Sequence, residues 1–109
     1  MWRRPTAIGY VRRDVCGVAQ DWDEIRIRSL AKRLGYELAK TVVFSALTDE
    51  PVTRLINVVR SLDAEAVVVP SAAHFDGAVP DRLVAVADVI TVEPENTYAR
   101  WAFEQLGEP

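Results

Sequence analysis

The segment AEAVVV, residues 64–69, decides the fold class of this chain. Only one of its six side chains is charged, and it ends in three valines, a residue type that favours strands. A run this apolar is typical of a central strand in a parallel sheet, where both faces are covered. The rest of the chain should therefore supply neighbouring strands and covering helices.

Three other segments are predicted to be strands. Residues 7–12, AIGYVR, form a short apolar run, and Gly9 within it marks a place where another element packs close to the backbone. Residues 36–44 carry β-branched side chains near their end, and residues 89–92 form a fourth short apolar run. The sheet is thus expected to contain four strands.

Helices are predicted between these strands from apolar spacing of i, i+3, i+4 and i+7. Asp21 is expected to cap the first helix, with Glu24 completing a capping-box-like pair, and Gly35 to end it. Pro51 is expected to open the second helix. A short helix is predicted over residues 81–87, and a final helix over residues 96–107 that Asn96 would cap.

The alternation of strands and helices predicts one α/β domain over residues 1–109, with its core at about 7–107. We expect a doubly wound, mostly parallel four-stranded sheet flanked by helices. Half of the residues are apolar and 27% are charged, which is ordinary for a soluble globular protein. No apolar run approaches the roughly 18 residues of a membrane span, and no signal-peptide pattern opens the chain. A cytoplasmic location without a membrane partner is therefore expected, and the single Cys16 suits a reducing compartment as a small, half-buried apolar residue.

The net charge of −3 is unevenly distributed along the chain. Residues 1–40 contain nine basic and five acidic residues, whereas residues 41–109 contain four basic and eleven acidic residues. The basic part could attract phosphate groups through Arg3, Arg4, Arg12 and Arg13. The alternative interpretation of these arginines is ordinary solvated surface.

Ligands of open parallel sheets bind beyond the carboxyl ends of the strands. Residues 12–14, 45–49 and 71–77 are expected at that edge. The five glycines of the chain form neither GxGxxG nor GxxxxGK[ST], so no nucleotide cofactor is predicted.

His74 is the only histidine and therefore the first candidate for catalysis or metal binding. Together with Cys16, Asp14 and Asp76 it lacks the paired spacing of metal ligands, so no metal is predicted and His74 is interpreted as an exposed loop residue. A nucleophile pair of Ser71 and His74 has no evident orienting acid.

Two segments carry a resemblance to a known family. IGYVRRDVCGVAQDWDEIRIRSLAKRLGYEL (8–38) and EAVVVPSAAHFDG (65–77) resemble the catalytic domain of the resolvase/invertase, or serine recombinase, family. The likeness covers about residues 7–92. It implies a first strand that ends in Tyr-x-Arg-x-Ser, and an active-site loop related to Asp-Arg-Leu-x-Arg after the third strand.

The catalytic positions implied by this resemblance are mostly replaced. Tyr10 and Arg12 match the family's Tyr-x-Arg, but the nucleophilic serine is Asp14, whose carboxylate repels a phosphodiester and cannot form a phosphoserine link. In the loop, Ala73 and His74 stand where the family has Asp-Arg, and Gly77 stands where it has a second arginine. Glu50 replaces an arginine that often precedes the helix-opening proline. The resemblance thus implies a catalytically inactive member of the family.

We therefore expect a non-catalytic resolvase-like domain that acts by protein binding or self-association. One alternative is a small-ligand binder or enzyme that uses Asp14, His74 and Asp76 as acid/base groups. A second alternative is an accessory to DNA recombination with weak, non-specific phosphate contacts through the four arginines named above. No cofactor is expected in any of these cases.

The end of the chain suggests an interface. In the resembled family a long dimerising helix leads to a separate helix-turn-helix domain, and only the start of that helix would fit at residues 96–107, with no helix-turn-helix domain expected. Tyr98, Trp101 and Gln105 would share one face of this helix. That face is predicted to join a homodimer or a recombinase-like partner.

Overall fold

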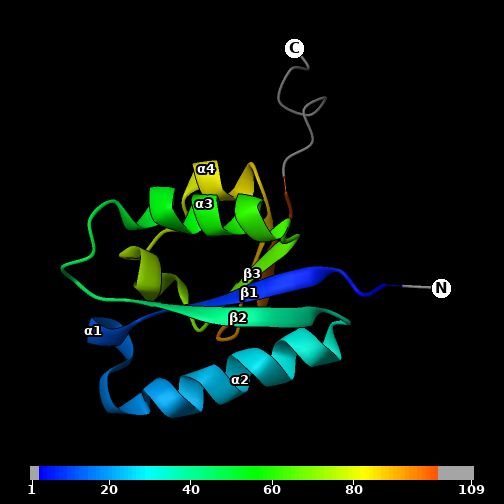
Figure 1. The fold of residues 1–109 in the computed structure, drawn as a ribbon. Helices are drawn as coiled ribbons and strands as arrows, with labels where there is room; N and C mark the ends of the chain where they lie inside the picture. The colour runs from blue at the N-terminus through cyan, green and yellow to red at the C-terminus, as the bar shows by residue number, and fades with distance from the viewer. Residues whose placement is uncertain (1–2, 101–109) are drawn as a thin grey trace.

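The fold is built around one mixed sheet. The computed structural model describes residues 3–100 of the chain. Within that range five strands pair in the order β2-β1-β3-β4-β5 (Figure 1). The strands are β1 (Thr6–Arg12), β2 (Glu37–Phe44), β3 (Ala66–Val69), β4 (Asp88–Thr91) and β5 (Asn96–Tyr98). The first four are parallel to one another, and β5 is antiparallel to β4.

Helices cover both faces of this sheet. They are α1 (Arg13–Cys16), η1 (Gly17–Ala19), α2 (Gln20–Arg33), α3 (Pro51–Leu62), η2 (Ala72–Phe75) and α4 (Asp81–Val84). Figure 1 places α2 on one face and α3 with α4 on the other. The strand order reverses between β1 and β3, because the chain passes from β1 to β2 and then returns across β1. None of the helices within residues 3–100 combines the length and apolar character of a membrane span.

The core consists of two layers that share the central strands. Ile8 and Tyr10 of β1 point toward α3 and α4, while Ala7 and Val11 point toward α2. All four side chains of β3 are 0% exposed, which confirms the prediction of a strand covered on both faces. The α3 layer is completed mainly by Leu55, Val59, Val67, Val69 and Leu83, and the α2 layer by Ile27, Leu30, Val68 and Ile90.

Gly9 allows α2 to approach the sheet closely, as its place in β1 predicted. A Cβ atom at this position would lie 2.6 Å from Thr41 Oγ1 and 2.9 Å from Ile27 Cγ2. Both distances are too short for a real contact, so residue 9 has room for a hydrogen only. The missing side chain thus determines how closely β1, β2 and α2 pack.

The predictions of four strands and of a helix starting at Asn96 are wrong. Residues 96–98 form β5, in which Thr97 pairs with Ile90 of β4. A further hydrogen bond, 2.6 Å long, joins the Arg100 amide to Asp88 Oδ1. Pairing along β4 satisfies backbone groups that a helix would leave open at this edge, which outweighs the capping signal of asparagine. Trp101 and Gln105 lie outside the described residues.

Several helix boundaries also differ from the prediction. The chain turns into α1 directly after β1, and α2 begins at Gln20, so Asp21 lies inside the helix and is not its cap. Glu24 accepts a side-chain hydrogen bond from Gln20, 3.0 Å long, in place of the expected capping pair. Pro51 is the first residue of α3, as predicted. The α4 helix ends at Val84, three residues earlier than expected.

Candidate functional site

The carboxyl edge of the sheet brings β1 and the loop after β3 together. The backbone amide of Arg12 donates a hydrogen bond of 2.8 Å to Nδ1 of His74. The Tyr10 hydroxyl donates to the His74 carbonyl oxygen over 3.2 Å. The Tyr10 ring stacks on Phe75, with ring centroids 5.1 Å apart. These contacts hold η2 against the end of β1.

Arg12 is surrounded by two carboxylates, and we call Arg12, Asp14 and Asp76 the Arg12 cluster. Its Nε and Nη2 donate to the two oxygens of Asp14 over 3.2 and 2.6 Å, and its Nη1 donates to Asp76 Oδ1 over 2.7 Å. The Arg12 side chain is only 15% exposed, and all three of its guanidinium nitrogens donate to these carboxylates. Hydrogen bonds from Arg12 lower the pKa of Asp14, and both carboxylates raise the pKa of Arg12. The cluster carries one more negative than positive charge.

His74 is buried, which corrects the interpretation of this residue as an exposed loop histidine. Its side chain lies in η2 and only 2% of the residue is exposed. Burial lowers its pKa, although the nearby charge of Asp23 opposes this effect. Because Nδ1 accepts the Arg12 amide, the proton of the neutral ring lies on Nε2. The imidazole is therefore a neutral hydrogen-bond donor through Nε2.

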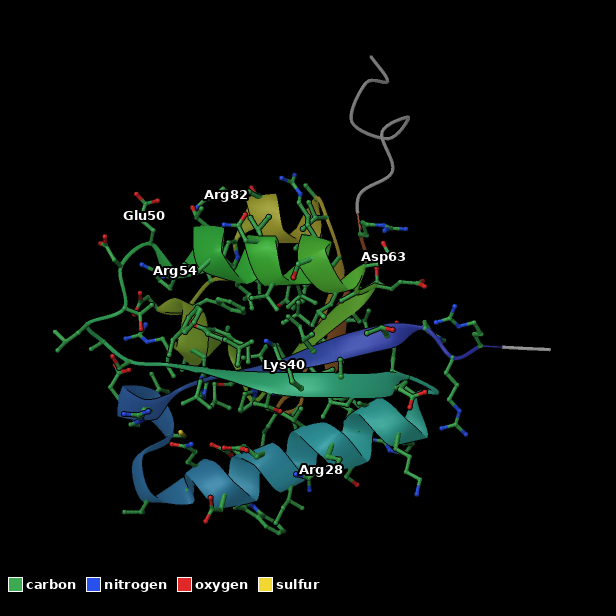
Figure 2. All side chains as sticks on the ribbon, viewed as in Figure 1. Arg28, Lys40, Glu50, Arg54, Asp63 and Arg82 are labelled. Atoms are coloured by element: carbon green, nitrogen blue, oxygen red, sulfur yellow. The ribbon has the colours of Figure 1, made fainter. Side chains whose placement is uncertain are left out.

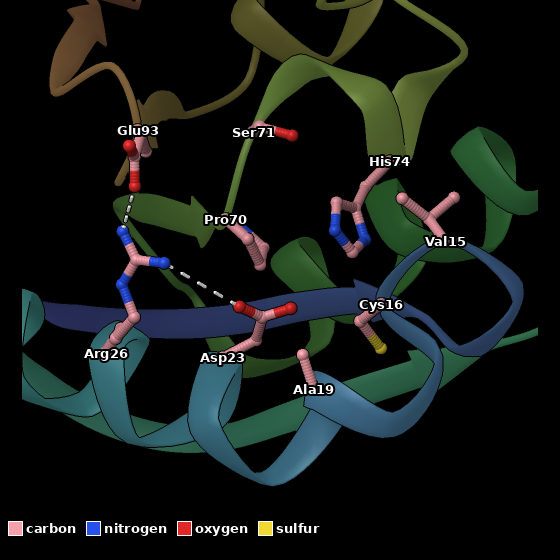
Figure 3. Close-up of a pocket in the computed structure, with 9 residues that line it drawn as sticks. All are labelled: Val15, Cys16, Ala19, Asp23, Arg26, Pro70, Ser71, His74 and Glu93. Carbon is pink, nitrogen blue, oxygen red and sulfur yellow. Dashed lines mark hydrogen bonds and ion pairs between the residues drawn. The ribbon is translucent and has the colours of Figure 1, made fainter.

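A pocket of about 380 Å³ opens between α2 and the ends of β1, β3 and β4 (Figure 3). His74 and Asp23 both point into it, from η2 and α2 respectively (Figure 3). Its lining consists of Val15, Cys16, Ala19, Asp23, Arg26, Pro70, Ser71, His74 and Glu93. We call this hollow the edge pocket. It combines a buried hydrogen-bond donor with a carboxylate.

Asp23 is the least satisfied polar group of the edge pocket. Only 9% of the residue is exposed, and no hydrogen bond to its carboxylate is found within the described part of the chain. Its ion pair with Arg26 is long, at 4.0 Å, because the other end of the Arg26 guanidinium donates to Glu93. Cys16 is half-buried, as predicted, and burial raises the pKa of its thiol, so it stays protonated near neutral pH.

Most of the site residues predicted from the sequence lie at this edge. Tyr10, Arg12, Asp14, His74 and Asp76 are in contact there. Ala73 and Gly77 belong to the same loop, where Gly77 adopts a φ of 102°, and neither brings a charge. Within residues 3–100 there is no group of three or more His, Cys, Asp or Glu that could hold a metal ion.

Sequence reasoning did not identify Asp23, Arg26 and Glu93 as site residues. One signal was available for Asp23, because it lies four residues before Ile27 and so falls on the buried stripe of α2. An acidic residue on an apolar stripe marks a position that needs a polar neighbour. Glu93 had no such signal, because its place beside Arg26 depends on the path of the chain after β4.

The four arginines predicted to contact phosphate do not form one patch. Arg3 and Arg4 precede β1, where they line a hollow with Thr6 and Glu37. Arg12 is the last residue of this seven-residue strand and Arg13 the first residue of α1, roughly 20 Å away. Figure 1 shows α1 at the end of β1 opposite to the N-terminus.

Neither the protein-family models nor the curated proteins compared with this chain match it.

Proposed function

We propose that this chain is a non-catalytic, resolvase-like domain that acts by binding protein, including a second copy of itself. The absence of catalysis is supported by the Arg12 cluster. Transfer of a phosphodiester needs a nucleophile and unpaired positive charge around the phosphorus. Here the residue at the nucleophile position is a carboxylate, and it is bound to the arginine that would contact phosphate. A net negative cluster repels a DNA phosphate.

The doubly wound, resolvase-like description of the fold belongs to the same proposal. It is supported by the reversal of strand order between β1 and β3 and by helices on both faces of the sheet. The predicted interface of Tyr98, Trp101 and Gln105 stays a prediction, as does a recombinase-like partner. Tyr98 is 41% exposed on β5.

The protein-binding part of the proposal is supported by exposed apolar side chains. Val15 and Val18 lie just before α2, and Trp22 and Ile25 lie in its first half. All four are more than a third exposed. Apolar side chains grouped on one part of a surface mark sites where protein partners bind.

Covalent capture of DNA tests the absence of catalysis. Purified protein is incubated with supercoiled plasmid, denatured, and analysed for nicks and for protein that remains attached to DNA. An active serine recombinase serves as the positive control. We expect neither product from the natural sequence or from Asp14→Ser, because Ala73, His74 and Gly77 still provide no arginine. An attached protein after denaturation would refute the proposal.

A small-ligand function is the second candidate, and the edge pocket favours it. Asp14 and Asp76 are bound to Arg12, so the groups free to meet a ligand are His74 Nε2 and the Asp23 carboxylate. They would suit a small molecule that offers an acceptor to the imidazole and an N–H donor to the carboxylate. Fragments of this kind, such as small primary amides, are titrated while the His74 ring nitrogens are followed by NMR. Asp23→Asn is the control and should abolish any shift; the absence of shifts from every fragment would remove this candidate.

A further inference from the structure

The outer face of α2 carries an apolar stripe, which we define as Val18, Trp22 and Ile25. Their spacing of i, i+4 and i+7 places them on one side of the helix and its preceding turn. They are 108%, 60% and 46% exposed, respectively. The opposite side of α2 is the one that packs on the sheet, through Ile27, Leu30 and Ala31. The stripe therefore points away from the protein's own core.

Charged residues flank this stripe with opposite signs at its two ends. Asp21 lies in the first turn of α2, and Arg28 and Lys32 lie toward its end. All three are exposed, and within residues 3–100 none of them forms an ion pair within 4.0 Å. Figure 2 shows Arg28 on α2, across the sheet from Arg54 and Arg82. The exposed face thus changes from negative to positive along the helix.

We infer that two copies of this chain associate through this face, with their α2 helices antiparallel and a two-fold axis beside Ile25. This inference rests on the self-association in the proposed function and names its surface. A two-fold interface brings each surface against itself in reverse order. Antiparallel helices then bring the acidic end of one copy to the basic end of the other, whereas parallel helices would place Asp21 against Asp21.

The axis beside Ile25 also gives each part of the stripe a matching partner. Trp22 lies opposite Arg28 of the second copy, where a guanidinium can stack on the indole face. Asp21 lies beside Arg28 and Lys32 of the second copy, and Val18 packs on the aliphatic part of that lysine. An interface of one helix per copy belongs to the small, weak class of protein contacts. We therefore expect a reversible dimer that forms at high micromolar concentration.

Sedimentation velocity over a concentration series tests the surface. The natural sequence should shift from monomer to dimer as its concentration rises to about 300 μM, and Trp22→Glu should weaken the dimer about tenfold or more. The melting temperature of Trp22→Glu should stay nearly unchanged, because Trp22 is already 60% exposed. Leu47→Glu is the matched control, since Leu47 is 93% exposed but lies outside α2, and it should dimerise normally.

Charge reversal tests the antiparallel arrangement. Asp21→Arg and Arg28→Glu should each weaken the dimer, because each places like charges opposite one another. The double variant carrying both changes should dimerise more strongly than either single variant, because opposite charges then face each other again at positions 21 and 28. In a parallel dimer each position faces itself, so the double variant would still place like charges together. Neither single change would then weaken the dimer relative to the natural sequence. Single variants that dimerise as strongly as the natural sequence would therefore refute the antiparallel arrangement.

The remaining outcomes separate this inference from the proposed function. A protein that stays monomeric at about 300 μM overturns the dimer, while the DNA-capture result still decides the absence of catalysis. A dimer that dissociates with Trp101→Glu but not with Trp22→Glu overturns the α2 surface and supports the interface predicted from the sequence. A monomer in which Trp22 is protected from a fluorescence quencher dissolved in the water also overturns the α2 surface. In that case the chain itself covers the apolar stripe.

Discussion

The His74 imidazole is kept neutral mainly by burial, and the hydrogen bond of 2.8 Å from the Arg12 amide to its Nδ1 atom determines its tautomer. A proton on Nδ1 would turn this nitrogen from an acceptor into a donor, so that it would face the Arg12 N–H donor to donor. Burial disfavours the imidazolium as well. One backbone amide of β1 thus sets the tautomer of a buried, neutral histidine, and the same contact positions the loop that carries Asp76.

This arrangement predicts how stability depends on pH. Because the pKa of His74 is lowered on folding, the unfolded chain binds a proton at a higher pH than the folded protein does. The His74 contribution is therefore fully present above the unfolded pKa of about 6.5 and decreases as the pH falls below it. We expect the melting temperature to fall between about pH 7 and pH 5.

His74→Asn isolates this effect, because its side-chain oxygen can still accept the Arg12 amide but does not titrate. The variant should melt at a lower temperature at neutral pH, owing to lost packing, and should show a flatter dependence on pH. Thermal denaturation followed by circular dichroism measures both. An unchanged pH dependence would show that another group is responsible. Asp14 does not interfere, since its pKa is lowered on folding: its stabilising contribution is fully present above the unfolded pKa of about 3.8 and decreases only as the pH falls below that value.

Among the secondary-structure elements, those with strong local patterns could be predicted and those defined by distant contacts could not. The valines of β3 and the proline of α3 indicated their elements correctly. β5 was missed because asparagine also caps helices, and its pairing with β4 depends on a tertiary contact. The carboxyl edge was foreseen as the site, since parallel strands end there together. The burial of His74 was not, because its partner is 62 residues away in the chain.

The close packing at Gly9 can be tested by substitution. Gly9→Ala should lower the free energy of unfolding by about 1–3 kcal/mol, because the new methyl group overlaps Thr41 and Ile27. Urea denaturation measures the change. In a Thr41→Ala background the same substitution should cost less, since the closest atom has been removed. Equal costs in both backgrounds would show that the packing of β2 is not the limiting contact.

Across the whole molecule, positive charge is divided between opposite edges of the sheet and partly neutralised. Arg3 and Arg4 lie at the amino edge, and Arg12 is bound to two carboxylates at the carboxyl edge. Arg26 and Arg33 form ion pairs with Glu93 and Glu95. The net charge of the chain is −3, and these five arginines do not form one extended surface that suits a DNA backbone.

We therefore expect any affinity for duplex DNA to be weak, non-specific and lost between about 50 and 200 mM salt. Fluorescence anisotropy with labelled duplexes of different sequence measures this. Replacing Arg3 and Arg4 together with alanine should reduce the low-salt affinity, whereas Arg12→Ala should not, because its guanidinium is already paired. Sequence-selective binding at physiological salt would contradict the expectation and support an accessory role in recombination.

The central place of β1 also has a consequence during synthesis. Although β1 leaves the ribosome first, its two neighbours are β2 and β3, and its pairing with β3 joins Ala7 to Ala66. A nascent chain that ends after α3 would leave one side of β1 open, with Ile8 and Tyr10 lacking Val67 and Val69. Stalled chains of increasing length should therefore gain protease resistance only once β3 has emerged. Until then the unfinished protein presents an apolar strand with one unpaired edge, the kind of segment that chaperones bind.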